Sequence, residues 1–237
     1  FGKKERIMTV FAHPDDAQLY CGGTINRLIK AGKRVQVVKM TAGNKGSRQE
    51  NISADKLAKL RGEEDHESLR VLGITNEDDM CLHINDGEIE NNLTTIGKLA
   101  KQIRIFKPDI VITHNPENVI IRYDKNVNWV NHRDHRNTGK SAIDAAYPYA
   151  RDLLFFPEHF EEKGASSHKV IEFLLVDYYD HPDLVYIDVE KFVDVRTEAL
   201  ACHTSQYSQQ QAQDSTDFFT KFPDGSRRER FRYVLAD

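Results

Sequence analysis

Two clusters of histidine and aspartate combine residue types and a spacing that suit metal-dependent chemistry. In the first, VFAHPDD at residues 10–16, His13 and Asp16 lie three residues apart, so one tight turn can aim both side chains at a single ion. Asp15 lies between them and points elsewhere, which leaves its carboxylate free to move protons. The alternative is a helix-capping aspartate at the end of a strand, because Asp favours caps and turns. This stretch alone fits both interpretations.

The second cluster is HRDH at residues 132–135, at the start of a predicted helix. On a helix, His132 and His135 lie at i and i+3 and share one face. One of them can bind a metal ion while the other reaches the substrate, and Asp134 can accept a hydrogen bond from a ring nitrogen and fix its tautomer. The alternative interpretation is a solvated, charged helix start that needs no function.

Both clusters follow predicted buried strands, the first after residues 6–12 and the second, across a long polar segment, after DIVIT at 109–113. Strands and helices alternate along the chain, which predicts an α/β fold with a mostly parallel sheet and helices on both faces. Ligands bind outside the carboxyl ends of such strands, so the clusters can face each other there. Further strands are expected at 35–41, 80–82, 168–178 and 184–187, helices at 19–31, 54–72, 93–106 and 190–201, and a turn at 85–87.

Composition narrows the class of protein. A chain of 237 residues, with 39% hydrophobic and 30% charged residues, is expected to form one soluble globular domain over residues 1–237. The net charge of −4 gives no electrostatic footprint for nucleic acid, and no apolar run approaches the roughly 20 residues that span a bilayer. Three cysteines without a C-x-x-C pair fit a reducing compartment, so a cytoplasmic location is expected. Export stays open, because the chain begins at Phe1 and not at a methionine.

Taken together, the two clusters resemble the LmbE-like or PIG-L family of zinc-dependent N-deacetylases. In that pattern H-P-D-D is followed by G-G-T and, about 120 residues later, by H-x-D-H. Other segments agree with it, namely the glycine-containing loop at 41–46, R-x-x-E at 61–64, N-D-G at 85–87, K-P-D at 107–109 and A-L-x-x-H-T-S-Q at 199–206. Three departures leave the substrate subtype undetermined: Ala17-Gln18 where an acidic residue is frequent, Arg133 where Pro is frequent, and Arg196 where Lys is usual.

The resemblance implies that His13, Asp16 and His135 bind the metal ion and that Asp15 is the general base. Two imidazoles and one carboxylate leave a tetrahedral zinc ion one open position for water, as in catalytic zinc sites. We therefore expect one Zn²⁺ per chain, with Fe²⁺ open as the native ion.

The resemblance also implies roles around the metal ligands. His132 matches the group that stabilises the oxyanion or protonates the leaving amine, held by Asp134. Arg61 and Asp86 match positions that contact the sugar in family members; a helix-surface ion pair and a turn-forming aspartate are the alternatives. His114, at the end of the DIVIT strand, is a weaker candidate for a supporting group.

The expected protein is therefore a Rossmann-like α/β enzyme that removes an N-acetyl group from an N-acetylglucosamine-type sugar or sugar conjugate. One alternative is a metal-dependent amide hydrolase that acts on a non-sugar substrate. Another is a non-catalytic zinc- or sugar-binding relic, against which the intact Asp15 argues. A nucleotide-binding protein is not expected, because no G-x-G-x-x-G follows the first strand. Assembly into a homo-oligomer stays open.

Overall fold

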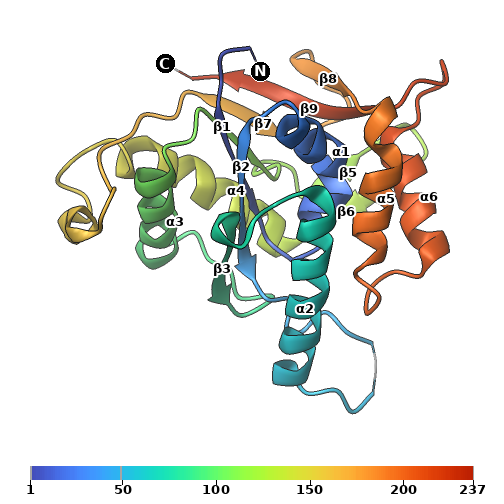
Figure 1. Ribbon diagram of the computed structural model, residues 1–237, viewed down its shortest axis with the longest axis horizontal. Coiled ribbons are helices and arrows are strands. Elements are labelled where there is room, and N and C mark those ends of the chain that lie inside the picture. The colour runs from blue at the N-terminus through green and yellow to red at the C-terminus, as the bar shows by residue number, and fades with distance from the viewer. Residues whose placement is uncertain (1, 49, 237) are drawn as a thin grey trace.

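A seven-stranded sheet in the order β3-β2-β1-β4-β7-β9-β8 forms the centre of the protein (Figure 1). The computed structural model describes residues 2–48 and 50–236. The strands are β1 (Arg6–Phe11), β2 (Arg34–Thr41), β3 (Asp79–Ile84), β4 (Ile110–Thr113), β7 (Glu172–Leu175), β8 (Leu184–Asp188) and β9 (Arg228–Leu235), and a separate hairpin consists of β5 (Ile120–Arg122) and β6 (Asn128–Val130). The expected mostly parallel sheet is confirmed.

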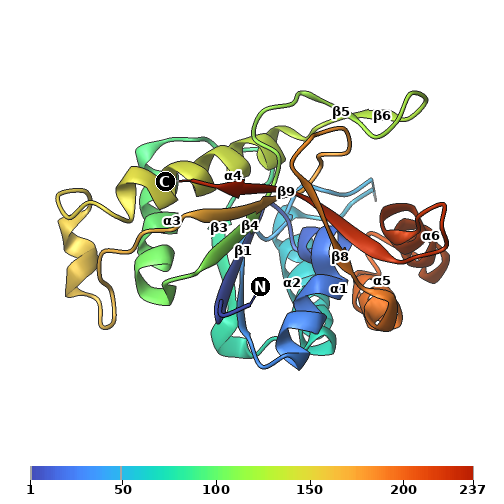
Figure 2. The same ribbon diagram turned by 90° about the horizontal axis from the view of Figure 1, so that it is seen from above.

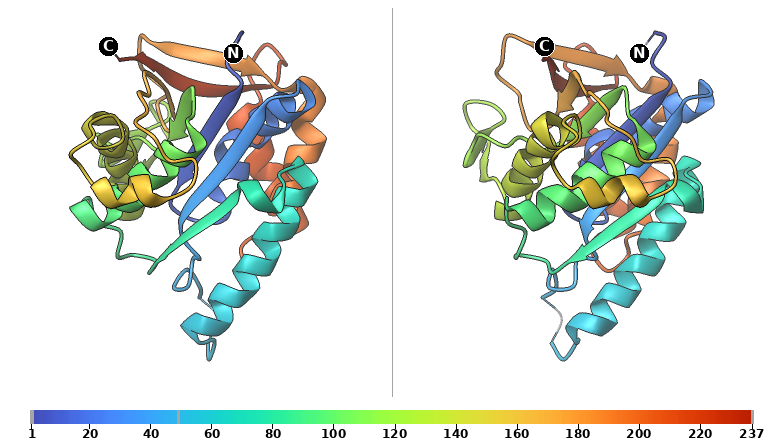
Figure 3. Two further views of the ribbon diagram at one scale, coloured as in Figure 1. Left: turned by 60° about the vertical axis from the view of Figure 1, so that its left-hand side comes forward. Right: turned by 90° about the vertical axis from the view of Figure 1, so that its left-hand side faces the viewer.

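The first four strands of the chain and β7 run parallel, whereas β9 pairs antiparallel with β7 and β8 antiparallel with β9. Ile7 of β1 aligns with Val35 of β2 on one side and with Ile110 of β4 on the other. The chain order therefore reverses between β1 and β4, which is where doubly wound sheets open a crevice for ligands. Figure 3 shows β1 and β2 running toward the same lower end of the molecule, where the loop before the second helix also lies.

Helices cover both faces of this sheet, as expected. Figure 2 shows α3 and α4 on one side and α1, α2 and α5 on the other. Strand β1 contributes to both cores, because Met8 and Val10 pack toward α3 and α4 while Ile7 and Phe11 pack toward α1 and α2. The α-helices are α1 (Asp16–Lys30), α2 (Ala54–Leu72), α3 (Leu93–Phe106), α4 (Arg133–Asp144), α5 (Val193–Ala201) and α6 (Gln209–Thr220), and short 3₁₀ or π turns occur at Asn76–Asp78, Ala145–Tyr149, Pro157–Glu161 and Glu190–Phe192.

Local signals account for the elements that were placed correctly. Helix α2 begins and ends as expected, because the Ser53 side chain accepts a hydrogen bond from the Lys56 N–H and Gly73 ends the helix at φ +90°. Helix α1 begins three residues before the expected position, at Asp16. None of the helices in the described residues is long and apolar enough to cross a membrane.

Other elements differ from the expectation. The strand expected at 168–178 shortens to β7, and the hairpin β5–β6 was not predicted, because three-residue strands carry too little periodicity. Helix α6 and strand β9 lie after Ser208, where no element was predicted. The capping box of Ser208 and Gln211 is the one sequence signal that could have placed α6.

Strand β9 anchors the helix that begins at the first cluster. Helix α1 is kinked at Cys21, whose φ of −147° and ψ of 23° are not helical. The backbone N–H groups of Gly23 and the next residue donate to the Glu229 carboxylate of β9 at 2.9 and 2.7 Å. A Cβ atom at Gly23 would come within 2.8 Å of a neighbouring side chain, so this close approach requires glycine. Glu229 also lies 3.1 Å from Nε of the fully buried Arg196 in α5.

Replacing this anchor should destabilise the fold. Glu229→Ala leaves Arg196 as an unpaired buried charge, which should lower the free energy of unfolding by about 3–5 kcal/mol. Urea denaturation measures the change, and Glu198→Ala on the exposed side of α5 is the control, with an expected change of about 0.5 kcal/mol or less. Equal losses in the two variants would show that the Glu229–Arg196 pair is not an anchor.

Candidate active site

A cavity of about 510 Å³ opens at the carboxyl ends of β1 and β4, at the reversal of strand order. The two sequence clusters meet there, although about 120 residues separate them. Of the eight expected site residues, all but Asp134 line the cavity. The lining residues are His13, Asp15, Asp16, Leu19, Lys45, Gly46, Arg61, Asp86, Gly87, His132, His135, Gln206 and Tyr207.

The turn after β1 separates the two adjacent aspartates. The Asp16 carboxylate accepts a hydrogen bond of 2.8 Å from the His13 backbone N–H, which fixes the turn. Asp15 occupies the N-cap position of α1, but its side chain makes no capping hydrogen bond. It accepts instead a hydrogen bond of 2.8 Å from the Arg61 guanidinium. The capping interpretation of Asp15 is therefore wrong for its side chain.

The three expected ligands lie in mutual contact. Nδ1 of His13 is 3.4 Å from Oδ2 of Asp16 and 3.3 Å from Nε2 of His135, and that Nε2 atom is 3.3 Å from Oδ1 of Asp16. A tetrahedral zinc ion with bonds of about 2.0–2.1 Å holds its ligand atoms about 3.3 Å apart. Asp16 faces His13 through Oδ2 and His135 through Oδ1, so the pairwise spacing of the side chains and their nitrogen and oxygen donors fit a zinc-class ion.

Overlapping sets of side chains could also hold an ion in this cavity. His132 approaches His13 and His135 closely enough to replace Asp16 in the ligand set. Within the described residues, two further groups have suitable spacing, namely Asp16, His114 and His135, and His13, Asp86 and Asp134. All three share residues with the expected triad, so they describe one metal-binding region.

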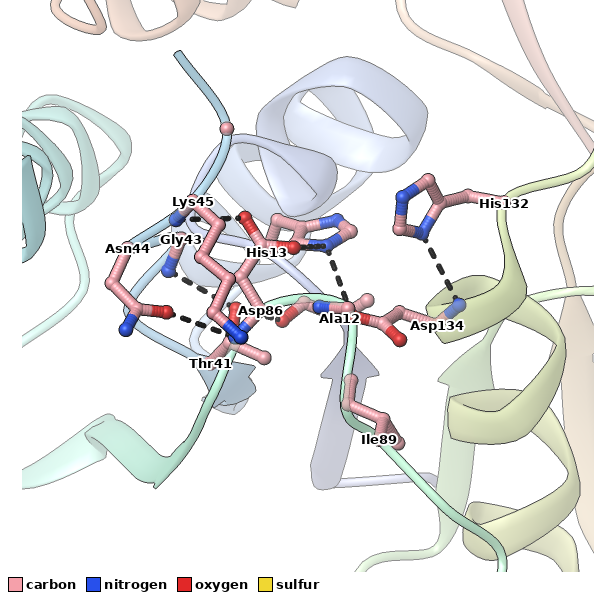
Figure 4. Close-up of polar contacts among 12 residues, drawn as sticks. Ala12, His13, Thr41, Gly43, Asn44, Lys45, Asp86, Ile89, His132 and Asp134 are labelled. Atoms are coloured by element: carbon pink, nitrogen blue, oxygen red, sulfur yellow. Dashed lines mark hydrogen bonds and ion pairs between the residues drawn. The ribbon is translucent and has the colours of Figure 1, made fainter. Parts of the chain in front are cut away.

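The outer nitrogen of His13 faces two carboxylates (Figure 4). Nε2 of His13 lies 3.2 Å from Oδ1 of Asp86 and 3.6 Å from Oδ2 of Asp134. Burial alone would lower the pKa of His13, but hydrogen bonds with Asp134, Asp16 and Asp86 outweigh burial and raise it well above its usual value. A carboxylate at the outer nitrogen is the usual device for orienting a metal-binding imidazole. Asp86 therefore supports His13 as well as lining the cavity, where it was expected to contact sugar.

The expected partner of Asp134 was wrong. Its carboxylate accepts a hydrogen bond of 2.6 Å from the Gly87 N–H and faces His13, whereas the expectation placed it against the ring of His132. His132 instead precedes α4 as its N-cap, and its Nδ1 accepts a hydrogen bond of 3.1 Å from the Asp134 backbone N–H. An imidazole that accepts at Nδ1 carries its hydrogen on Nε2 when neutral, so His132 can donate from Nε2.

Burial lowers the pKa of His132, and the charges of His13 and His135 lower it further. Around Asp16, burial would raise the pKa, yet the charge of His135 and hydrogen bonds with His114 and His13 hold it well below its usual value. Asp16 is therefore an anionic ligand candidate and His132 a neutral donor.

His114 contributes more to the site than the sequence indicated. Its ring is fully buried, stacks on His135 with centroids 3.9 Å apart, and places Nε2 at 3.2 Å from Oδ2 of Asp16. Burial lowers its pKa to about 3, so it is neutral. His114 therefore packs against two expected ligands, His135 and Asp16. The sequence signal for this role was the position of His114 directly after a strand in the centre of the sheet, where ligand-binding residues are expected.

Arg61 reaches the cavity from α2 and is almost completely buried, which excludes the helix-surface ion pair as its role. Besides Asp15, it donates to the Gly43 carbonyl oxygen at 3.2 Å. Gly43 has φ +64°, and a Cβ atom there would lie 2.3 Å from the guanidinium. Glycine at position 43 therefore allows the Arg61 guanidinium to lie close against the loop after β2.

The model of the PIG-L family, described as GlcNAc-PI de-N-acetylase, matches residues 8–146, more than half of the chain. The chain belongs to this family. The matched segment contains all the expected ligands and the general-base candidate. The family expected from the two clusters is thereby confirmed.

Two relatives of this PIG-L chain are named as deacetylases. Diacetylchitobiose deacetylase of Thermococcus kodakarensis is 26% identical over 212 residues, covering 87% of this chain and 72% of the relative. A 1D-myo-inositol 2-acetamido-2-deoxy-alpha-D-glucopyranoside deacetylase of a Mycobacterium species is 25% identical over 248 residues, covering 86% and 74%.

Solved structures support the same fold. N,N'-diacetylchitobiose deacetylase of Pyrococcus horikoshii matches with a TM-score of 0.83 at 25% identity, over 99% of this chain and 85% of that one. A 4-carboxy-2-hydroxymuconate hydratase of Pseudomonas putida matches with a TM-score of 0.71 at 19% identity, over 98% and 97%, and shares the fold alone. The fold alone therefore does not define the reaction.

The two carboxylates at His13 predict a measurable effect on metal affinity. Asp134→Asn and Asp86→Asn each replace an acceptor of the His13 Nε2–H by an amide, which should weaken zinc binding about 10- to 100-fold. Competition with a zinc chelator measures the dissociation constant. Asp55→Asn, at an exposed position of α2, is the control and should bind zinc as the parent does. Parental affinity in both site variants would show that His13 needs neither carboxylate.

Proposed function

We propose that this chain is a zinc-dependent hydrolase that removes the N-acetyl group from an N-acetylglucosamine-type sugar or sugar conjugate, within one catalytic domain of residues 1–237. One ion would be held by His13, Asp16 and His135. The observation that carries the proposal is the contact of these three side chains at 3.3–3.4 Å beside Asp15, a carboxylate that neither caps its helix nor joins the triad. Family membership supports the reaction class.

The residues around the triad suit amide hydrolysis. When bound, a zinc ion polarises the amide carbonyl and makes water more acidic. Asp15 accepts a proton from the attacking water as the new C–O bond forms. His132, with its hydrogen on Nε2, stabilises the oxyanion or protonates the leaving nitrogen as the C–N bond breaks. Acetate and a free amino sugar result.

The substrate class rests on the relatives and on the walls of the cavity. The relatives act on N-acetyl sugars, as their names state. Arg61 and Asp86 line the cavity with a cation and an anion, both of which hydrogen-bond well to hydroxyl groups. We propose that they orient the sugar. A cytoplasmic location stays a prediction, and assembly into a homo-oligomer stays open.

A substrate panel tests the proposed function. The chelated protein is assayed for amine release from N-acetylglucosamine, its methyl glycoside, N,N'-diacetylchitobiose and a non-sugar acetamide, with and without added Zn²⁺. Release from the sugars only after zinc is returned supports the proposal. Release from the non-sugar acetamide alone would favour a different amide hydrolase, and the absence of release from every compound would favour a binding relic.

The two adjacent aspartates should respond differently to the same change. Asp15→Asn keeps the shape but removes the base, so we expect stoichiometric zinc and a loss of turnover of about 10²–10⁴-fold. Asp16→Asn should lose zinc affinity first, and excess metal should partly restore its turnover. Zinc content and turnover are measured on both purified variants. Loss of zinc from Asp15→Asn, or near-parental turnover, would contradict the base role.

A further inference from the structure

The face of α2 that packs against the rest of the protein carries buried polar side chains among its leucines. Arg61 and Glu64 lie about one turn apart on this face, and both are almost completely buried. Arg61 reaches Asp15, whereas Glu64 reaches a segment that follows α5. A buried carboxylate is costly unless donors satisfy it, so the partners of Glu64 indicate what it holds in place.

Glu64 binds the segment after α5 through three hydrogen bonds. Oε1 accepts from the Thr204 hydroxyl and from the Ser205 backbone N–H, both at 2.7 Å, and Oε2 accepts from the Ser205 hydroxyl at 2.6 Å. Both carboxylate oxygens are therefore used, and all three donors belong to two consecutive residues. Such an arrangement fixes the backbone of this segment relative to α2.

The same segment is fixed at two further points. The backbone N–H groups of Gln206 and Tyr207 both donate to the His203 carbonyl oxygen at 2.9 Å, and the His203 side chain is fully buried. The Gln206 side chain donates to the Gly46 carbonyl oxygen at 3.2 Å, which ties the segment to the loop after β2. The next residue, Tyr207, is thereby presented to the cavity.

Tyr207 meets Asp15 in the cavity. Its phenol and the Asp15 carboxyl group line the same cavity and interact there, and burial raises the pKa of Tyr207. A phenol that stays protonated beside a carboxylate donates its hydrogen. Arg61 donates to Asp15 at 2.8 Å, so the Asp15 carboxylate is held by a donor from α2 and faces the phenol of Tyr207 from a second element.

We propose that Tyr207 is a positioning residue for Asp15 and that Glu64 acts one step further out, by holding the 204–205 segment that presents Tyr207. This proposal rests on the proposed function, because it assigns a supporting role to that function's general base. The phenol and the Arg61 guanidinium orient the carboxylate, so that it faces the attacking water. Sequence patterns did not single out Tyr207, although it directly follows the H-T-S-Q segment.

Tyr207→Phe removes only the hydroxyl group and keeps the ring. We expect kcat to fall about 10- to 100-fold, as is usual for groups that orient a site residue, with KM and zinc content near parental. Tyr186→Phe, on the edge strand β8, is the matched control and should leave kcat unchanged. In the Asp15→Asn background, Tyr207→Phe should cause no further loss, because residues that act through one another are not additive.

Glu64→Gln tests the outer step. It removes the negative charge and leaves one acceptor oxygen in place of two, which weakens the hydrogen bonds to the segment. We therefore expect kcat to fall in the same direction as in Tyr207→Phe, and the double variant should be no worse than the poorer single one. Ser205→Ala removes the hydrogen bonds that the hydroxyl makes with Glu64 and with the Gln206 side chain but keeps the backbone donor to Glu64. It serves as the milder variant where Glu64→Gln folds poorly. A lower melting temperature with parental kcat in both would show that Glu64 is only structural.

Crystal structures give a readout that does not depend on turnover. Glu64→Gln should move the Tyr207 hydroxyl away from the Asp15 carboxyl group relative to the parent, and Tyr186→Phe should not. If the parent releases no amine from any N-acetyl sugar, the proposed function fails, and the structures still test the link from Glu64 to Tyr207. An unmoved Tyr207, an unchanged kcat in Tyr207→Phe, or an equal loss in the Asp15→Asn background would each overturn the positioning role.

Discussion

Opposing carboxylates on the two sides of one imidazole determine how this site is built. Asp16 lies 3.4 Å from Nδ1 of His13, and Asp86 lies 3.2 Å from its Nε2. Negative charge gathered on buried carboxylates requires a positive partner. A protonated His13 can supply it when no ion is bound, and a divalent cation beside Nδ1 can take its place. The hydrogen on Nε2 then serves Asp86 and Asp134, so metal binding and imidazole orientation depend on each other.

The sheet provides the geometry for this arrangement. Because β1 and β4 are neighbours with connections leaving in opposite directions, the turn after β1 and the residues after β4 reach the same crevice. His13 comes from the first and His114 from the second, and α4 begins close enough to bring His135 between them. Helix α1 begins at Asp16 and is kinked at Cys21, and Glu229 binds the backbone of the helix just after this kink.

The sequence predicted what local signals encode. Apolar runs placed β1 and β4, Ser53 and Gly73 bounded α2, and the two clusters showed which side chains would meet. Contacts that form only in the folded protein could not be predicted from the sequence. The carboxylate of Asp134 selects His13 over its neighbour His132, and no spacing rule distinguishes the two rings. Likewise Tyr207 lies far from Asp15 in the sequence, and only tertiary packing brings both residues to the same cavity.

The central claim concerns which atoms bind the ion, and anomalous diffraction from crystals of the zinc-loaded protein tests it most directly. The account predicts one zinc peak bonded to Nδ1 of His13, a carboxylate oxygen of Asp16 and Nε2 of His135 at about 2.0–2.2 Å, with Asp15 outside the ligand set. A zinc ion bonded to Asp15, or placed on the other side of His13 between Asp86 and Asp134, would contradict it.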